Sequence, residues 1–509
     1  MEKIIAYDLG TGGIKASLFD ENGRSLSESF IAYPTYYPND RWCEQRPMDW
    51  WKGVVDSTKA LLQKSGTAPN EITCAALSGH SLVTAPMSKD GELLLDQVPI
   101  WCDMRPADMT EDFFRNVPYA DWYLTTGNGD PPECYSILKM MWMKKYQPEI
   151  YGKTDVVLGS KDFINYMLTG NKCTDPSYAS GFGVYNLLKW DYEDAFFRAA
   201  GIGRDIFPDI VPSGAVMGRV TKEASRATGL PEGIPVACGG VDNTCMALGA
   251  RGMGEGKAYT SLGSSSWIAV TAQKPILDLK TRPFVFAHAE KGYYTSAVSI
   301  FSAGNSFRWM RDTMMYDVPE ETRYDRMNEM AASVPVGSNG VLFNPTLAGG
   351  SAQEKSPNLH GGFMGLSLGT TREDLVRASM EGIAMSLRCT LDILKTQVAL
   401  DREMLICGGG SKSPLWRQMF ADIYNMEILK TNVDQDAAAL GAAALAANAC
   451  GMWSGYGKIE NLHITEDVKL PIWENNAKYE KLLEIYKDWS DMLAGLGDRM
   501  EKLHGEKVW

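Results

Sequence analysis

The stretch Ala6-Tyr-Asp-Leu-Gly-Thr-Gly-Gly-Ile-Lys-Ala16 joins two short apolar runs through a glycine-rich turn. Residues 3–7, 14–20 and 25–33 are all short and β-prone, and good turn sequences join them, so the sequence predicts an antiparallel meander. The glycines lead into a strand, whereas those of a dinucleotide-binding unit open a helix. Neither Gly-x-Gly-x-x-Gly nor Gly-x4-Gly-Lys-[Ser/Thr] occurs, which argues against Rossmann and P-loop nucleotide sites.

The stretch Ala258-Tyr-Thr-Ser-Leu-Gly-Ser-Ser-Ser-Trp-Ile-Ala269 repeats this layout half a chain later. Strands are expected at Lys257–Ser261 and Trp267–Thr271, around a turn of small residues. A chain of 509 residues is also too long for one core. The repeat therefore suggests a duplicated α/β domain with a flexible, glycine-rich boundary near residues 246–256. The expected units are residues 1–248, residues 256–450 and a helical tail at 451–509.

Composition excludes several classes of function. A net charge of −13 and a pI near 5.1 argue against nucleic acid, whose binding proteins carry a basic face. No apolar run of about 18 residues occurs, and the first 20 residues begin a strand where a signal peptide would have a basic end, so we expect a soluble, cytoplasmic protein without membrane contact. The 10 cysteines are scattered singly and only 5 histidines accompany them, which predicts reduced, mostly buried thiols and no zinc site.

Helices are predicted between and after the two hairpins. Aromatic-rich helical stretches are Pro47–Gln63 and Ser136–Tyr146. Thr371 should cap a helix together with Asp374, three residues later, and apolar residues then recur at steps of three or four. We interpret that apolar stripe as domain core.

The two glycine-rich turns are candidate phosphate sites. A tight turn between strands can point several backbone N–H groups into one concave spot, and such nests bind phosphate oxygens. In the first turn Thr11 could add a hydroxyl donor and Lys15 a charge, whereas the acidic Asp8 is better suited to Mg²⁺ or its waters. An ordinary hairpin with turn glycines would look the same.

Asp242 is the candidate general base. It lies in Gly239-Gly-Val-Asp-Asn-Thr244, just beyond a predicted strand at Pro235–Gly239, and ligands of open α/β sheets bind at such strand ends. A carboxylate there could accept the proton of an attacking hydroxyl. Asp242 could instead, or in addition, cap a helix over Asn243–Gly249.

Two further stretches are candidate binding sites. Trp101-Cys-Asp-Met-Arg105, read as an extended segment, would place a ring, a carboxylate and a guanidinium on one side, as polyol binding requires, although a surface Asp–Arg pair would show the same residues. Leu405-Ile-Cys-Gly-Gly-Gly-Ser-Lys-Ser-Pro414 is an apolar strand entering a glycine turn, where the backbone could approach a purine. A plain β-to-α loop is the alternative.

Together these stretches resemble the FGGY carbohydrate kinase family of the actin–hexokinase–Hsp70 superfamily. The most specific match is Gly361-Gly-Phe-Met-Gly-Leu366 followed, after seven residues, by Asp-Leu-Val-Arg-Ala-Ser-Met-Glu381, which is similar to the family's C-terminal signature. Asp8-Leu-Gly-Thr resembles its first phosphate loop, Ser261-Leu-Gly-Ser-Ser its second, and Gly408-Gly-Gly-Ser-Lys-Ser-Pro-Leu-Trp-Arg-Gln418 its adenosine loop.

The resemblance implies two ribonuclease-H-like domains flanking a central cleft, with transfer of the ATP γ-phosphate to a sugar hydroxyl. It implies Asp242 as catalytic base, and Asp8 is the metal candidate from the chemistry of its turn. The sugar-binding candidates are His80, Trp101, Asp103, Arg105 and Asp242. The ATP-binding candidates are Gly10, Thr11, Gly12, Lys15, Ser261, Gly263, Ser264, Gly304, Asn305, Gly408, Gly409, Gly410 and Ser413.

The acceptor sugar is harder to predict. Trp42-Cys-Glu-Gln-Arg-Pro-Met-Asp-Trp50 is similar to a stretch of xylulokinases, but their Ser-Gly-Gln-Met-His-Gly becomes Ser78-Gly-His-Ser-Leu-Val83. Leu82 thus takes the position of their substrate-contacting histidine and His80 that of the glutamine; His80 could contact sugar or simply be buried. D-Xylulose or a related ketopentose is expected, with ribulose, a tetritol, a pentitol, glycerol or a sugar acid as alternatives.

A second class of function is a non-catalytic nucleotide switch or sugar sensor on the same fold. The joint presence of Asp8, Thr11 and Asp242 favours the kinase. A homodimer is expected only as the commonest state of soluble enzymes.

Overall fold

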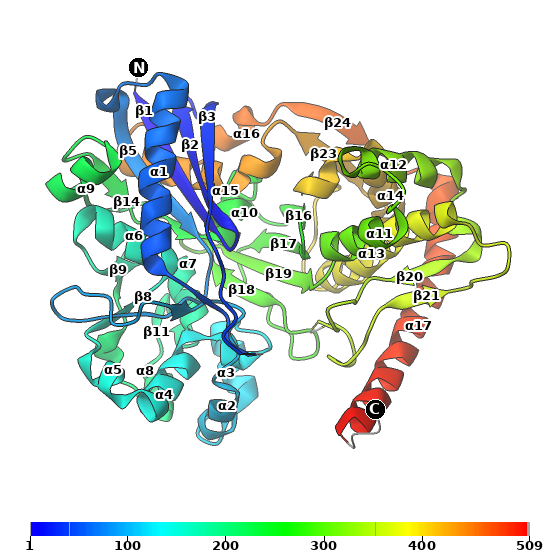
Figure 1. The fold of residues 1–509 in the computed structure, drawn as a ribbon, viewed down its shortest axis with the longest axis horizontal. Helices are drawn as coiled ribbons and strands as arrows, with labels where there is room; N and C mark the ends of the chain where they lie inside the picture. Colours follow the sequence, from blue (N-terminus) through cyan, green and yellow to red (C-terminus); the bar gives the residue numbers. More distant parts are fainter. Residues whose placement is uncertain (1, 40, 352, 506–509) are drawn as a thin grey trace.

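The computed structural model describes residues 2–39, 41–351 and 353–505, which form two α/β halves (Figure 1). Each half is built on a seven-stranded mixed sheet. No helix in the described residues combines the length and hydropathy that crossing a membrane requires.

The first sheet begins with the predicted meander. Its central strands are β1 (Lys3–Gly10), β2 (Gly13–Asp20) and β3 (Ser25–Ala32), each antiparallel to the next. On the other side of β1, β5 (Ile72–Gly79) and then β14 (Pro235–Ala237) run parallel to it. The sheet is completed by β13 (Val216–Arg219), paired with β14, and by β15 (Gly240–Val241), paired with the end of β5.

The second sheet repeats this arrangement. Three antiparallel strands, β19 (Tyr294–Ile300), β17 (Ser266–Ala272) and β16 (Ala258–Leu262), are followed by β22 (Glu403–Cys407) and β23 (Glu427–Thr431), parallel to β16. β18 (Phe284–Ala287) and β24 (Thr465–Lys469) form its edges. The same strand pattern in both halves is the repetition that the two hairpin sequences predict.

Helices cover both sheets. In the first half they are α1 (Pro47–Ser65), α2 (Ala107–Phe114), α3 (Tyr119–Thr126), α4 (Ser136–Tyr146), α5 (Pro148–Lys153), α6 (Ser160–Thr169), α7 (Pro176–Ala179), α8 (Asp194–Ala200), α9 (Lys222–Thr228) and α10 (Asp242–Gly249). In the second they are α11 (Gly304–Met314), α12 (Arg323–Ser333), α13 (Arg372–Lys395), α14 (Pro414–Tyr424), α15 (Ala437–Ala449), α16 (Lys458–Leu462) and α17 (Trp473–Gly505).

Short strands pair outside the two main sheets. They are β4 (Glu44–Gln45) with β7 (Val98–Pro99), β6 (Ala85–Met87) with β8 (Val156–Leu158), β9 (Cys173–Thr174) with β12 (Asp209–Ile210), β10 (Tyr185–Asn186) with β11 (Asp191–Tyr192), and β20 (Leu342–Asn344) with β21 (Gly362–Met364). The β4–β7 pair becomes important at the site.

Helix α13 confirms the predicted capping and periodicity. The Thr371 hydroxyl accepts the Asp374 N–H, and the Asp374 carboxylate accepts the Thr371 N–H in return. Its predicted apolar stripe is fully buried in the core of the second half, at Val376, Met380, Ile383, Leu387, Leu391 and Leu394.

Helices α10 and α15 join the two halves. Nine of the 13 residues of α15 are alanine, and the helix packs against β1, β5 and α10. A Cβ atom on Gly441 would lie 2.0 Å from the Cys245 carbonyl oxygen, and one on Gly249 would lie 1.8 Å from the Ala437 carbonyl oxygen. Only glycine at these two positions lets the helix backbones come so close.

The segment after residue 450 differs from the expected helical tail. β24 lies between α16 and α17 and extends the second sheet by pairing with β23. Val468 pairs with Leu429, and the Arg417 side chain donates a hydrogen bond to the Asp467 carboxylate. The position of this strand therefore depends on residues that are distant in sequence. α17 then passes along the second half, and residues 506–509 lie outside the described range (Figure 1).

Candidate active site

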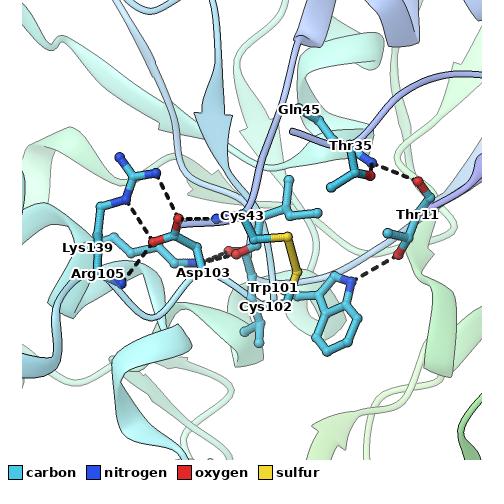
Figure 2. Close-up of a disulfide and its surroundings, with 11 residues drawn as sticks. Thr11, Thr35, Cys43, Gln45, Trp101, Cys102, Asp103, Arg105 and Lys139 are labelled. Atoms are coloured by element: carbon cyan, nitrogen blue, oxygen red, sulfur yellow. Dashed lines mark hydrogen bonds and ion pairs between the residues drawn. A yellow bond between two sulfur atoms is a disulfide. The ribbon is translucent and has the colours of Figure 1, made fainter. Parts of the chain in front are cut away.

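The first glycine turn is held through its oxygen atoms. The Tyr33 hydroxyl donates to the Gly10 carbonyl, and Gln45 Nε2 donates to the Thr11 carbonyl at 2.7 Å. Trp101 Nε1 donates to the Thr11 hydroxyl at 2.9 Å (Figure 2). Because these acceptors are engaged by protein donors, the turn is suited to offer its N–H groups and the Thr11 O–H to an anion.

Acidic and basic groups cluster beside this turn. Asp8 Oδ1 accepts a hydrogen bond from the Ser78 hydroxyl at 2.9 Å. Burial raises the pKa of Asp8, and the nearby Lys15 opposes that rise. Lys15 Nζ lies 2.5 Å from Asp436 Oδ1, directly before α15, so the lysine expected at a phosphate also ties the first hairpin to the second half.

Asp242 is the first residue of α10, directly after β15. Its carboxylate accepts the Asn243 N–H at 2.7 Å. Val241 is the N-cap residue of α10 and Asp242 lies inside the helix, so the alternative role of Asp242 as a helix cap is wrong. Burial is the main cause that raises the pKa of Asp242 to about 7, and the charge of Asp8 adds to it. A carboxyl with this pKa can exchange a proton near neutral pH.

The second turn lines a cavity of about 800 Å³. Of the predicted nucleotide residues, Gly263, Ser264, Gly304, Gly409, Gly410 and Ser413 line it, and Ser261, Asn305 and Gly408 are their near neighbours in the chain. Gly10, Thr11, Gly12 and Lys15 are not among its lining residues. The structure thus gathers the candidates of the second half around one cavity, whereas those of the first half lie outside it.

Glycine is required where α11 meets the second turn. The Gly304 N–H donates to the Gly263 carbonyl, and the Asn305 N–H donates to the Ser264 carbonyl, both at 3.0 Å. A Cβ atom on Gly304 would lie 2.4 Å from the Gly263 oxygen. Any larger residue at this position would therefore push α11 away from the turn.

The cavity has an aromatic wall that the sequence did not predict. Phe307 stacks on Tyr324 with ring centroids 5.9 Å apart and lies 4.8 Å from Trp416. These rings come from α11, α12 and α14, so no local pattern connects them. Together with the glycine backbone at 409–410 they suit a flat heteroaromatic ring.

Asp103 and Arg105 form a buried network that also includes Glu44. Arg105 Nε and Nη2 donate to the two Asp103 oxygens, both at 2.8 Å, and Nη2 also binds Glu44 Oε1. The Cys43 N–H donates to Asp103 Oδ2 at 2.8 Å (Figure 2). The alternative of a surface Asp–Arg pair is therefore wrong, and so is the extended conformation, because residues 101–102 form a turn.

Trp101 is the exposed member of that stretch, with 43% of its surface accessible. Asp103 is fully buried and both its oxygens are engaged by protein donors. The network therefore braces the loop from within, while the ring of Trp101 is the part that a ligand could contact.

His80 is buried, only 2% exposed, and packs edge-on against Trp50. Burial lowers the pKa of His80 to about 4, so its ring is neutral. Nearby, Leu82 adopts a φ of 62°, and Lys139 Nζ donates to the carbonyls of Leu82 and Ile100, both at 2.7 Å. Burial lowers the pKa of Lys139 to about 8.

The cysteines depart from the expectation that all ten are reduced. Cys43 and Cys102 form a disulfide, with Cα atoms 5.8 Å apart, and the other eight are free (Figure 2). β4 pairs with β7, and the Ile100 N–H donates to the Cys43 carbonyl, which brings together residues 59 positions apart. Such a pairing cannot be read from singly scattered cysteines.

Comparison with known proteins covers almost the whole chain. Residues 3–249 match the N-terminal domain of the FGGY family of carbohydrate kinases, and residues 258–450 match its C-terminal domain. The xylulose kinase of Bacillus subtilis (strain 168) is 30% identical over 496 residues, and the gluconokinase of the same organism is 26% identical over 497, each alignment covering 96% of both chains. The crystal structure of ligand-bound xylulose kinase from Lactobacillus acidophilus superimposes with a TM-score of 0.90 at 25% identity, covering 98% of this chain and 100% of that one.

Proposed function

The chain belongs to the FGGY family of carbohydrate kinases, a family that implies ATP as phosphate donor, and we propose that its acceptor is D-xylulose or a related ketopentose. The 30% identity with the Bacillus subtilis xylulose kinase, over 96% of both chains, supports this acceptor. The use of ATP favours the cytoplasmic location expected from the sequence.

The role of Asp242 is the central proposal for catalysis, and its environment is the observation that carries it. A carboxylate that titrates near pH 7 at the start of α10, with Asp8 beside it, suits a general base. In the proposed reaction Asp242 accepts the proton of the sugar hydroxyl as that oxygen attacks the γ-phosphorus. The phosphorus–oxygen bond to ADP breaks, and ADP leaves.

The two turns are proposed to hold the triphosphate. The cavity in the second half would take the adenosine against its aromatic wall, and the first turn would bind phosphate oxygens through its N–H groups and Thr11. Asp8 would hold Mg²⁺ through one carboxylate. That donor set fits, because Mg²⁺ is usually bound by one or two carboxylates plus phosphate oxygens and water. When bound, Mg²⁺ would neutralise charge on the transferring group.

The acceptor would lie against Trp101, with the Asp103–Arg105–Glu44 network fixing the loop beneath it. A sugar acid is the second candidate, because the gluconokinase of Bacillus subtilis aligns over the same 96% of the chain. Leu82 favours this second candidate over xylulose, because a leucine side chain cannot hydrogen-bond the hydroxyl that a histidine would contact at this position in xylulokinases.

The test is ADP release by the purified protein with MgATP and a panel of acceptors. The panel contains D-xylulose, D-ribulose, gluconate, a tetritol, a pentitol and glycerol. Asp242→Asn is expected to lower kcat by ~10²–10⁴-fold while ATP affinity changes little. Asp90→Asn, at an exposed turn, is the matched control.

One acceptor far above the others, with its turnover lost in Asp242→Asn, would support the proposal and name the substrate. A strong preference for gluconate would replace the ketopentose with a sugar acid. Slow ATP hydrolysis that ignores every acceptor would favour a nucleotide switch, and an unchanged kcat in Asp242→Asn would remove that residue from the base role.

A further inference from the structure

A buried cluster of charged side chains lies behind the segment that leads into Asp242. Lys161 of α6 bonds Asp162 Oδ1 at 2.6 Å and Asp175 Oδ1 at 3.0 Å, and all three side chains are fully buried. Burying charges is costly unless each has fixed partners, and the reaction proposed above gives none of the three a chemical step. Their hydrogen bonds lead to the backbone of the proposed base.

Asp175 orients the Ser177 hydroxyl at the start of α7. The hydroxyl donates to Asp175 Oδ2 at 2.5 Å, and Lys161 balances the charge of this carboxylate from its other oxygen. A hydroxyl has one proton, so a Ser177 oxygen that donates to Asp175 faces other groups as an acceptor. The Val241 N–H donates to it at 3.0 Å. Val241 directly precedes Asp242, so one buried hydroxyl fixes the last peptide before the proposed base.

The same cluster anchors the beginning of this segment. Lys161 Nζ and Asn165 Nδ2 both donate to the Cys238 carbonyl, at 3.3 and 2.8 Å. The Gly239 N–H donates to the carbonyl of Ser213, whose hydroxyl binds the cluster at 2.7 Å. The backbone is thus held at three positions in the four residues before the proposed base, each time by a buried residue.

We propose that Ser177, oriented by Asp175, is a positioning residue for phosphoryl transfer, because it fixes the backbone from which the Asp242 carboxylate enters the candidate site. This role rests on the proposed function of Asp242 as general base. The Asp242 carboxylate accepts the N–H of the next residue, Asn243, at 2.7 Å, so its direction follows the local backbone. A displacement of ~1 Å at a reacting group can cost ~10²-fold in rate, so a small shift at Val241 would lower kcat.

The first test compares two buried serines in the acceptor assay. Ser177→Ala removes the acceptor of the Val241 N–H and should lower kcat by ~10–10²-fold, with KM for MgATP and for the acceptor changed by less than about twofold. The KM values hold because the glycine turns and Trp101 keep their own contacts. Ser57→Ala is the matched control, since the Ser57 hydroxyl is also fully buried and donates to the Val54 carbonyl within α1. It should leave kcat unchanged, although both variants lose a buried hydroxyl.

A double variant distinguishes positioning from a general loss of structure. The combination of Asp242→Asn and Ser177→Ala should be as slow as Asp242→Asn alone, because misplacing a base that is already absent has no further cost. Hydrogen–deuterium exchange gives a readout without turnover. In the ligand-free protein, the peptide that covers residues 238–242 should exchange faster in Ser177→Ala than in Ser57→Ala, since the Val241 N–H has lost its acceptor.

An unchanged kcat in Ser177→Ala, beside a lowered kcat in Asp242→Asn, would overturn the positioning role and leave the proposed base intact. The same would follow if Ser177→Ala slowed the wild type and the Asp242→Asn variant by equal factors, or if exchange at 238–242 did not change. An unchanged kcat in Asp242→Asn would overturn the proposed base and this role with it. Slowing that depends on Asp242, together with faster exchange at 238–242, would support both.

Discussion

The pH dependence of phosphoryl transfer should report the environment of Asp242. An aspartate in water has a pKa near 3.8 and would be fully ionised throughout pH 6–8. In the structure, burial and then the charge of Asp8 raise the pKa of Asp242 to about 7, opposed by the Asn243 N–H. Since only the ionised form can accept a proton, about one tenth of the molecules would be active at pH 6 and about nine tenths at pH 8.

The assay is the initial rate at subsaturating acceptor and MgATP, which follows the groups of the free enzyme. We expect a rising limb with a midpoint near pH 7 and a slope approaching tenfold per pH unit below it. Burial lowers the pKa of Lys139 to about 8, so loss of its charge would make the rate fall at higher pH. The rate should therefore rise with pH where Asp242 titrates and fall with pH where Lys139 titrates, which distinguishes the two groups. The residual activity of Asp242→Asn should lack the rising limb.

A flat rate between pH 6 and 8 would refute this reasoning. It would mean either that Asp242 is already ionised, and so better solvated than the structure indicates, or that proton transfer to it does not limit the rate. Recording the carboxyl ¹³C resonance of Asp242 against pH in the ligand-free enzyme separates the two. A midpoint near 7 with a flat rate leaves the pKa intact and rejects the base.

Three other outcomes are expected. Trp101→Phe removes the hydrogen-bond donor to Thr11 but keeps an aromatic ring, so the KM for ATP should rise about fivefold, the equivalent of one hydrogen bond of ~1 kcal/mol. The control Trp473→Phe should leave this KM unchanged. Equal KM values in the two variants would contradict a role of the Trp101–Thr11 hydrogen bond in ATP binding. Asp242→Asn should stabilise the fold above pH 7 by ~1–4 kcal/mol. The carboxyl of Asp242 binds its proton more tightly in the folded than in the unfolded protein, so the stability of the wild type falls as the pH rises from about 4 to about 7. A difference in Tm between variant and wild type that is as large at pH 4 as at pH 8 would contradict this. Dithiothreitol should lower Tm by a few degrees, through loss of a cross-link worth ~2–4 kcal/mol, and Cys102→Ser should make Tm insensitive to it; a wild-type Tm that ignores the reductant would argue against the disulfide.

The parts of the fold that local sequence determines were predictable. Both hairpins, the start of α13 and the glycine turns follow from residues a few positions apart, where strand propensity, capping and turn chemistry operate. The same holds for Asp242, because a strand followed by a helix puts the intervening residue at the sheet edge.

The contacts that organise the site were not predictable, because they join distant positions. Trp101 reaches Thr11 across 90 residues and Arg105 reaches Glu44 across 61. The segment at 101–105 alternates as a strand would, yet it turns so that Asp103 and Arg105 can neutralise each other in the interior. A buried ion pair outweighs a local preference for extension, since an unpaired buried charge is far more costly.

The close crossing of α10 and α15 depends on two glycines, Gly249 and Gly441, and it affects distances in the candidate site. Asp242 opens α10, and Asp436, the partner of Lys15, directly precedes α15. One acidic group of the candidate site therefore lies at the start of each helix, and the distance between these two groups follows from how closely the helix axes approach. Because Gly249 and Gly441 have no Cβ atom, the helices can approach closely, and this approach sets the distance between Asp242 and the first hairpin. A methyl group at either position, more than a helical turn away, would widen the candidate active site.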